Sequence, residues 1–342
     1  MSIRDFTANV ISATKVVPDG NFKDSKASGV WDINEALDLI KGGNWPNVAN
    51  INPAAFVDAL FQTYLFTGTG SGTSTIANGI DLSGEGGLVW IKSRTGTSGE
   101  SHFLVDTERG GSAVLQSNST AVPSNFIGSP NFLSNGFSGT TNINDAQDYV
   151  SWTFRKQPKF FDVVKYTGNG SSGHSISHSL GSVPGMIIVK NLDDGSLGWR
   201  VWHRSLTNPN SITLNSTGAA SSDAGYFTTT DPTSSVFYVG DSGWVNQNNS
   251  NFIAYVFAHN NNDGGFGEPG DQDIIKCGSY QGNGNATGPS VTLGFEPQFL
   301  MIKKYNGGTG AWEVVDIMRG FPVDTAGDRV IRWNENGAEN TS

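Results

Sequence analysis

Gly86-Gly87-Leu88-Val89-Trp90-Ile91-Lys92 has two counterparts later in the chain, Pro184-Gly185-Met186-Ile187-Ile188-Val189-Lys190 and Pro297-Gln298-Phe299-Leu300-Met301-Ile302-Lys303. Each stretch runs from a turn residue through four apolar residues to a lysine. Four or five apolar residues between turn signals are typical of a buried strand and too few for a helix. We expect each lysine to lay its stem along the sheet and to hold its ammonium group in water at the strand end.

The sequence around these stretches repeats as well, so each is expected to lie in the middle of a sheet. Gly-x-Gly motifs follow the opening strands, and the closing strands alternate apolar and polar residues with the period of two typical of a half-buried strand. The predicted opening strands are Phe61–Phe66, Asp162–Tyr166 and Asp273–Lys276; the predicted closing strands are Tyr149–Phe154 and Phe252–Phe257; Phe103–Val105, Trp199–His203, Phe237–Val239 and Trp312–Val315 are further predicted strands.

The repeats predict an all-β protein of tandem jelly-roll-type β-sandwich domains, because about 100 residues are enough for an independent domain. The predicted divisions are an N-terminal segment 1–55 with a short helix at 31–41, repeat A at 56–158, repeat B at 159–260, a Gly/Asn/Asp linker at 261–272, and an incomplete repeat C at 273–342. Repeat C reaches Ser342 without a closing strand. We expect that either the polypeptide continues or a partner chain supplies this strand.

Composition narrows the classes of function. The net charge of −10 disfavours nucleic-acid binding and docking on anionic lipid, since both need clustered Lys and Arg. No run approaches the roughly 20 apolar residues of a membrane span, so we expect no membrane insertion. Residues 1–20 carry charges and no continuous apolar core, which disfavours a secretory signal. A single cysteine, Cys277, excludes a disulfide framework within one chain.

No catalytic constellation or cofactor site is expected. Gly168–Gly173 matches the dinucleotide pattern G-x-G-x-x-G, but strand-like alternation follows where a helix is required, so a hairpin loop is favoured. His174 and His178 are four residues apart, which in a strand places them about 13 Å apart, too far to share a metal ion. Acidic residues of the linker region are the one metal-binding candidate, for calcium, although their spacing is not that of an EF-hand and a solvated linker is favoured; they are Asp263, Glu268, Asp271 and Asp273.

Two further residue sets were weighed as sites. Arg109, Arg204 and Arg319 recur at matching places, which indicates a structural charge pairing. Four tryptophans could stack on sugars, but a sandwich core uses tryptophan at least as often, and core positions are favoured; they are Trp199, Trp202, Trp244 and Trp312.

The motifs of repeat A resemble, in order, those of modules in tail fibres and related virion proteins of marine, cyanophage-like bacteriophages. Repeat B follows more loosely, with Trp202-His203-Arg204 and Gly225-Tyr226-Phe227 at corresponding places, and Gly29–Glu35 with Trp45-Pro46 resembles the segment that precedes such modules. The motifs in repeat A are Gly86–Arg94, Val105–Gly110, Leu115–Asn118, Ser134–Phe137 and Tyr149–Phe154. The resemblance implies a concanavalin-A-like sandwich without a transferable catalytic set, and a homotrimeric fibre.

The function expected from this resemblance is structural and adhesive. Segment 1–55 would attach the chain to the tail or to other virion proteins, and the sandwiches would form a shaft or bind host-surface glycan, with assembly in the host cytoplasm. Two alternatives remain. One is a carbohydrate-binding protein or glycan hydrolase, for which Glu85, Glu100, Asp106 and Glu108 are the available acids. The other is a capsid decoration protein.

Overall fold

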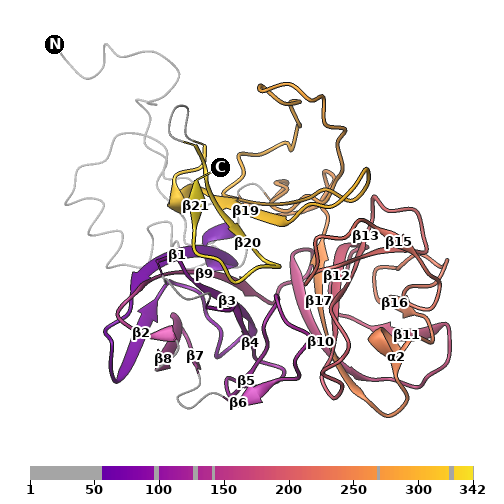
Figure 1. Cartoon of the computed structure of the whole chain (residues 1–342), viewed down its shortest axis with the longest axis horizontal. Helices are drawn as coiled ribbons and strands as arrows, with labels where there is room; N and C mark the ends of the chain where they lie inside the picture. Colours follow the sequence, from indigo (N-terminus) through magenta and orange to yellow (C-terminus); the bar gives the residue numbers. More distant parts are fainter. Residues whose placement is uncertain are drawn as a thin grey trace, which may run out of the picture. The chain divides into compact units, whose positions relative to one another are not determined.

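The computed structural model describes residues 56–95, 100–125, 130–140, 143–267, 270–322 and 327–341, which belong to the compact unit Ala54–Ser342. The predicted segment 1–55 and its helix at 31–41 lie outside the described residues. Regular structure is almost entirely antiparallel β-sheet (Figure 1), which confirms the predicted all-β sandwich class. None of the described helices is long and apolar enough to cross a membrane.

Repeat A consists of two facing sheets and begins after the short 3-10 helix η4 (Val57–Ala59). The main sheet has the order β1-β9-β3-β4, with β1 at Phe61–Thr67, β9 at Asp148–Arg155, β3 at Gly87–Ser93 and β4 at Phe103–Asp106. The covering sheet has the order β2-β8-β7, from Thr73–Ala77, Gly136–Thr140 and Asn131–Leu133, and β5 (Ala113–Val114) pairs with β6 (Ser124–Asn125).

Repeat B has the same plan. Its main sheet is β10-β17-β12-β13-β14-β15, from Phe161–Thr167, Asn251–Ala258, Pro184–Asn191, Arg200–His203, Asn210–Thr213 and Ser221–Ser222. Its covering sheet pairs β11 (His174–Ser177) with β16 (Val236–Val239), and the short helix α2 covers Gly243–Asn246. In both repeats the closing strand, β9 or β17, therefore lies between the opening strand and the central strand.

Repeat C has one sheet, in the order β18-β19-β20-β21, from Phe299–Lys303, Trp312–Asp316, Arg329–Arg332 and Asn340–Thr341, with the 3-10 helix η6 at Ile317–Arg319. The central strand β18 stands at the edge of this sheet. The opening strand predicted at Asp273–Lys276 is wrong, because these residues are irregular. In repeats A and B the opening strand pairs only with the closing strand, and the described part of repeat C has no closing strand.

The alternation of apolar residues decides which core each side chain joins. In β3, Leu88 and Trp90 face one side, while Val89 and Ile91 pack against the covering sheet. In β12, Ile188 belongs to the same cluster as Leu88 and Trp90, whereas its neighbours Ile187 and Val189 pack against the covering sheet of repeat B. A strand buried on both faces reads as a continuous apolar run, which is why the central stretches stand out in the sequence.

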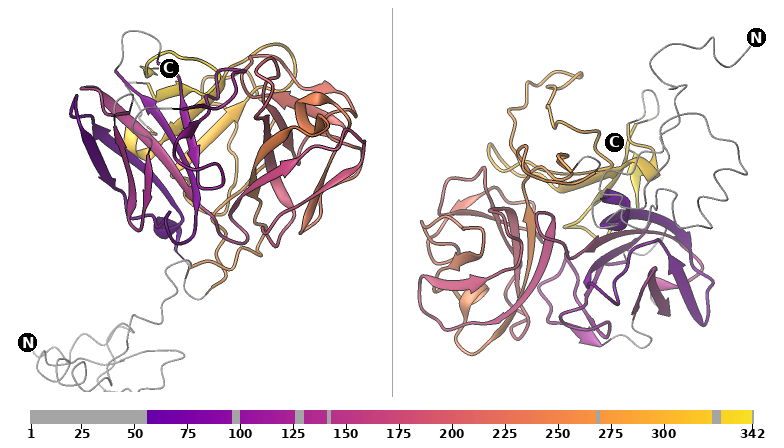
Figure 2. Two further views of the ribbon diagram at one scale, coloured as in Figure 1. Left: turned by 90° about the horizontal axis from the view of Figure 1, so that it is seen from below. Right: turned by 180° about the vertical axis from the view of Figure 1, so that it is seen from behind.

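The three repeats share one hydrophobic core. A single cluster contains Trp90 and Trp152 of repeat A, Tyr255 of repeat B, and Trp312 and Trp333 of repeat C. At its centre the Trp333 ring stacks on the Trp90 ring with centroids 3.5 Å apart. The strands of the three repeats can be followed around this region in the views of Figure 2.

Candidate functional site

A cavity of about 670 Å³ lies beside the edge strand β18. This volume is within the range of small-molecule and peptide pockets, roughly 300–1,000 Å³. All three repeats contribute to a mostly aromatic and aliphatic wall, and the irregular segments 272–282 and 293–298 of repeat C complete it. The apolar wall residues that enter the argument below are Phe154, Met186, Phe257, Phe299 and Met301.

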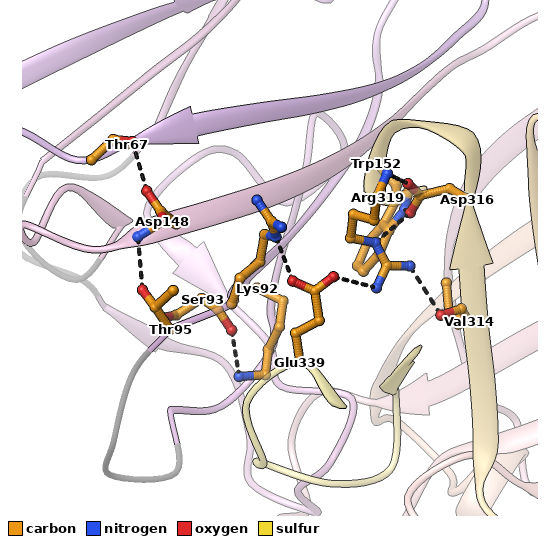
Figure 3. Close-up of polar contacts among 11 residues, drawn as sticks. Thr67, Lys92, Ser93, Thr95, Asp148, Trp152, Val314, Asp316, Arg319 and Glu339 are labelled. Carbon is orange, nitrogen blue, oxygen red and sulfur yellow. Dashed lines mark hydrogen bonds and ion pairs between the residues drawn. The ribbon is translucent and has the colours of Figure 1, made fainter. Parts of the chain in front are cut away.

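Next to this cavity, the indole of Trp152 in repeat A donates to a buried ion pair of repeat C (Figure 3). Arg319 donates through Nε to Oδ2 of Asp316 at 2.7 Å, and the indole Nε1 of Trp152 donates to the same carboxylate oxygen at 3.0 Å. The Arg319 and Asp316 side chains are both fully buried. Glu339, just before the last strand β21 of repeat C, accepts from Nε of Arg94 at 2.8 Å and thereby ties repeat C to the end of β3.

The same arrangement joins repeat B to repeat A. Arg109 donates to Asp106 through Nε at 2.7 Å, and the hydroxyl of Tyr255 donates to the Asp106 carboxylate at 2.8 Å. Burial raises the pKa of Tyr255 well above its usual value, so this hydroxyl keeps its proton. Strand register makes the two junctions equivalent, since Asp106 lies opposite Leu88 in β3 and Asp316 lies opposite Phe299 in β18.

The corresponding position in repeat B is His203, which lies opposite Met186 in β12. Leu206 stands where Arg109 and Arg319 stand in the other repeats, three residues further on, so no ion pair forms here. The predicted matching role of Arg204 is therefore wrong: it follows His203 directly and is exposed. His203 and Leu206 line the cavity, and burial lowers the pKa of His203 to about 4, which keeps the imidazole neutral.

A second ring of contacts follows the same cyclic order. Trp199 of repeat B donates to the carbonyl of Gln116 in repeat A at 3.0 Å, and Trp312 of repeat C donates to the carbonyl of Thr213 in repeat B at 3.1 Å. The ring of His102 in repeat A lies 3.0 Å from the carbonyl of Arg332 in repeat C. Since its Nδ1 accepts from the indole of Trp90, its Nε2 is the donor. Each repeat thus donates to a different neighbour.

The lysines that end the central strands are placed differently from the prediction. Lys92 and Lys190 are buried, with 1% and 0% of their surface exposed, and each ammonium donates to the backbone carbonyl of the next residue. Burial lowers the pKa of each to about 8. Lys303 is only half-buried and donates to the carbonyl of Thr217 at 2.9 Å, which adds a contact from repeat C to repeat B.

Two buried asparagines, Asn144 and Asn246, order the Gly-x-Gly loops. Their side-chain oxygens accept from the backbone amides of Thr69 and Asn169, and their amide groups donate to carbonyls of the same loops. The loop Gly168–Gly173 connects β10 to β11, which pairs with β16 rather than with β10. It is therefore a link between two sheets, and the predicted hairpin is wrong.

The candidate metal ligands have other partners. His174 binds the side chain of Asn246, and Nδ1 of His178 accepts from the amide of Leu180. Asp273 accepts from the amides of Asn262 and Gly264, as in a turn, and Glu268 lies outside the described residues. Among the residues that the structure describes, no group of three or more His, Cys, Asp or Glu side chains is arranged to hold a metal ion.

The four acids weighed for glycan hydrolysis are engaged separately. Asp106 lies in the buried ion pair described above, Glu85 pairs with Arg155, Glu108 pairs with Lys156, and Glu100 accepts from Gln147. The tryptophans largely follow the core prediction: Trp199, Trp202 and Trp312 are buried. Trp244 is half-buried and lies beside Tyr226 and the guanidinium of Arg200.

The comparisons with known proteins bear on residues 58–342. No curated protein and no solved structure matches the chain. The model of one family, described as a domain of unknown function, DUF7483, matches residues 58–342. This range contains all three repeats, both buried Asp–Arg junctions and the cavity beside β18. The chain therefore belongs to the DUF7483 family.

Proposed function

We propose that the chain is a structural component of a bacteriophage particle, most readily a tail fibre, whose repeats form a rigid unit of a shaft. The supporting observation is the set of buried contacts between repeats: Trp152 to Asp316, Tyr255 to Asp106, and the indole–carbonyl bonds of Trp199 and Trp312. Such contacts fix neighbouring modules at one angle, which is what a load-bearing fibre needs. The resemblance of the repeat motifs to phage virion modules supplies the biological setting.

The test is the presence of the chain in assembled particles. Particles purified by density gradient from a lysate that contains this chain are digested and analysed by mass spectrometry. The expected result is a set of peptides from residues 58–342 at a constant ratio to a known tail protein. Abundant chain in the lysate but none in the particles would contradict the proposal.

The native mass of the purified chain tests the fibre proposal, and the location of the chain on the particle separates the fibre from a capsid decoration protein. Light scattering is expected to give three times the chain mass of 36.3 kDa, because the resemblance to phage fibre modules implies a homotrimer. Immunogold labelling of particles with antibodies to the chain is then expected on the tail. Label over the capsid would favour the decoration protein instead.

Binding of host glycan remains the second candidate, and one observation favours it. Of the four tryptophans weighed as sugar platforms, Trp244 is the half-buried one, and it lies beside Tyr226 with ring centroids 5.9 Å apart. Stacking on aromatic rings is a common mode of sugar binding, and the two rings together offer such a surface. Glycan-array binding that is lost in Trp244→Ala and kept in Trp312→Phe would support it, and no binding by the wild-type chain would contradict it.

A further inference from the structure

The edge of β18 presents unpaired backbone groups, and the equivalent strand β3 of repeat A shows which residues carry them. In repeat A the amide of Lys156 donates to Gly86 and the amide of Arg94 donates to Asp148, so the even-numbered residues of β3 turn their backbone toward β9. The pairing of β3 with β4 matches the pairing of β18 with β19. In this alignment Phe299, Met301 and Lys303 of β18 occupy the places of Leu88, Trp90 and Lys92. In the part of the chain that the structure describes, no strand pairs with this edge of β18.

The rest of repeat C is also arranged as if one strand were missing. Ile302 is 38% exposed, whereas its counterpart Ile91 in repeat A is fully buried. Tyr280 and Val291, in the irregular segment that precedes β18, are 48% and 50% exposed. In repeats A and B the opening strand joins its sheet only through the closing strand. The cavity occupies the space beside this edge.

The glycines of the Gly-x-Gly loops give an independent sign. A Cβ on Gly68 or Gly168 would collide with the backbone carbonyl of Asp145 or Gln247, in the segments that lead into the closing strands. The corresponding Gly282 of repeat C has nothing within 4 Å of such a Cβ. Repeat C thus has a glycine at the position where, in repeats A and B, the segment before the closing strand packs against the loop. No described segment packs against Gly282.

We propose that the edge of β18 is a docking site for one extended strand of a partner polypeptide, which completes repeat C by β-strand addition. Strand addition gives affinity through main-chain hydrogen bonds and specificity through pockets for alternate side chains. The partner strand has the chemistry of β9 and β17: about eight residues, with apolar side chains at alternate positions directed into the cavity. This inference does not depend on the phage setting proposed above.

His203 specifies the residue at the centre of the partner strand. Trp152 and Tyr255, the central residues of β9 and β17, each donate to an aspartate of the neighbouring repeat. In the same cyclic order, the third central residue meets His203. Nδ1 of His203 accepts from the amide of Ser205, so the neutral ring offers Nε2–H as a donor. The partner residue must therefore accept a hydrogen bond, which tyrosine does and tryptophan cannot.

A second copy of the chain is a weaker occupant. Within the described residues the chain has two closing strands, and both are paired on each side in their own sheets. A second copy would have to unfold repeat A or B to donate one of these two strands. A partner strand costs only the ordering of an extended peptide.

The test uses the full chain and a synthetic peptide with the sequence of Asn251–Ala258, flanked by lysines for solubility. Calorimetric titration is expected to show one peptide bound per chain. Hydrogen exchange is expected to slow at Phe299–Lys303 and within residues 276–298 when the peptide is bound. In β17, Ile253 and Tyr255 turn their backbone groups toward the central strand, because Asn251 accepts from the amide of Leu192.

Two N-methylated peptides form the matched controls. Methyl groups on the nitrogens of Ile253 and Tyr255 remove the hydrogen bonds to β18, and affinity is expected to fall at least tenfold. Methyl groups on Ala254 and Val256 face away from β18 and are expected to weaken binding less. A peptide with Phe for Tyr255 is expected to bind about threefold to tenfold more weakly to the wild-type chain, and this difference is expected to vanish in His203→Leu.

Three outcomes would overturn the proposal. One is the absence of binding to a chain that light scattering shows to be monomeric. Another is the absence of binding to a chain that self-associates with slow exchange at Phe299–Lys303, which would assign the edge to a second copy. The last is equal binding of all N-methylated peptides, which would show that the peptide attaches without pairing to β18.

Discussion

At the scale of single residues, buried charge is the most consequential feature of this molecule. Asp106, Arg109, Asp316 and Arg319 are nearly or fully shielded from water, as are the stems of Lys92 and Lys190. A buried ion pair is weak evidence for stability, but removal of one partner leaves an uncompensated charge and is costly. The Asp–Arg pairs therefore act as specificity elements: they fix which repeat faces which.

The first prediction concerns the ion pair of repeat C to which Trp152 of repeat A donates. Asp316→Ala leaves the buried Arg319 without its carboxylate and is expected to lower the free energy of unfolding by about 3–5 kcal/mol. The double variant Asp316→Leu/Arg319→Leu removes both charges and is expected to cost markedly less. Urea unfolding measures both. As a control, Arg204→Met at an exposed position is expected within about 0.5 kcal/mol of the wild type. A loss below about 1 kcal/mol in Asp316→Ala would refute this role.

The second prediction is a dependence of stability on pH. Burial lowers the pKa of Lys92 and Lys190 to about 8 from the usual 10.5. Between pH 8 and 10.5 the unfolded chain therefore binds more protons than the folded one. The free energy of unfolding is expected to rise with pH in this window, by up to about 1.4 kcal/mol per pH unit for each lysine, and to lose this gain as pH falls toward 8.

Urea unfolding at pH 8, 8.75 and 9.5 checks this dependence. The upper limit stays below pH 10 because burial raises the pKa of Tyr149 above its usual value, and tyrosine ionisation in the unfolded chain then opposes the trend. Lys92→Met is expected to reduce the slope by about half, as one of two equivalent groups. Lys165→Met, at an exposed position in β10, is expected to leave it unchanged. An equal slope in both variants would contradict the assignment.

At the scale of elements, the sequence predicted most strands, whereas it carried no prediction of their pairing. The central strands β3, β12 and β18 lie where their apolar runs place them. In β3 and β12, burial on both faces leaves a direct trace in the sequence. The strand predicted at Asp273–Lys276 does not form, because a strand also needs a neighbour to pair with, and local sequence does not contain that neighbour. The buried lysines were missed for a similar reason, because a carbonyl acceptor for the ammonium is visible only in the fold.

Among the candidate sites, the recurrence of Arg109 and Arg319 correctly indicated a structural charge pairing. Arg204 was matched to them because it is an arginine, although its position in the strand register differs. Asn144 and Asn246 were not predicted, although the Gly-x-Gly loops that they organise stood out. Their partners lie 75 and 77 residues away along the chain, a distance over which spacing carries no signal. The cavity beside β18 could not be predicted either, because it depends on how three repeats meet.

The third prediction compares equivalent glycines. Gly168→Ala places a Cβ against the backbone of Asn246 and Gln247 and is expected to cost about 1–3 kcal/mol by overpacking. Gly282→Ala, at the same motif position in repeat C, meets open space and is expected within about 0.5 kcal/mol of the wild type. Thermal unfolding of the two variants side by side distinguishes them. Equal losses would show that the Gly282 loop is already enclosed.

At the scale of the whole molecule, three sandwich-derived repeats pack around one core. Trp90, Tyr255 and Trp333, one from each repeat, belong to the same hydrophobic cluster. Side-chain hydrogen bonds run in a cycle, from repeat A to repeat C, from repeat B to repeat A and from repeat C to repeat B. A repeat therefore cannot open without exposing apolar surface of its two neighbours. This property suits a rigid structural unit, and it makes the stability of the repeats inseparable.

The most direct measurement of this claim is scanning calorimetry of the full chain, read together with hydrogen exchange. The account predicts one cooperative transition for residues 58–342, with equal calorimetric and van't Hoff enthalpies. It also predicts that Trp333→Ala, which removes a buried ring at the shared core, lowers the stability of strands in all three repeats by the same amount, about 3–5 kcal/mol. Separate transitions for the repeats, or a loss of protection confined to repeat C, would contradict it.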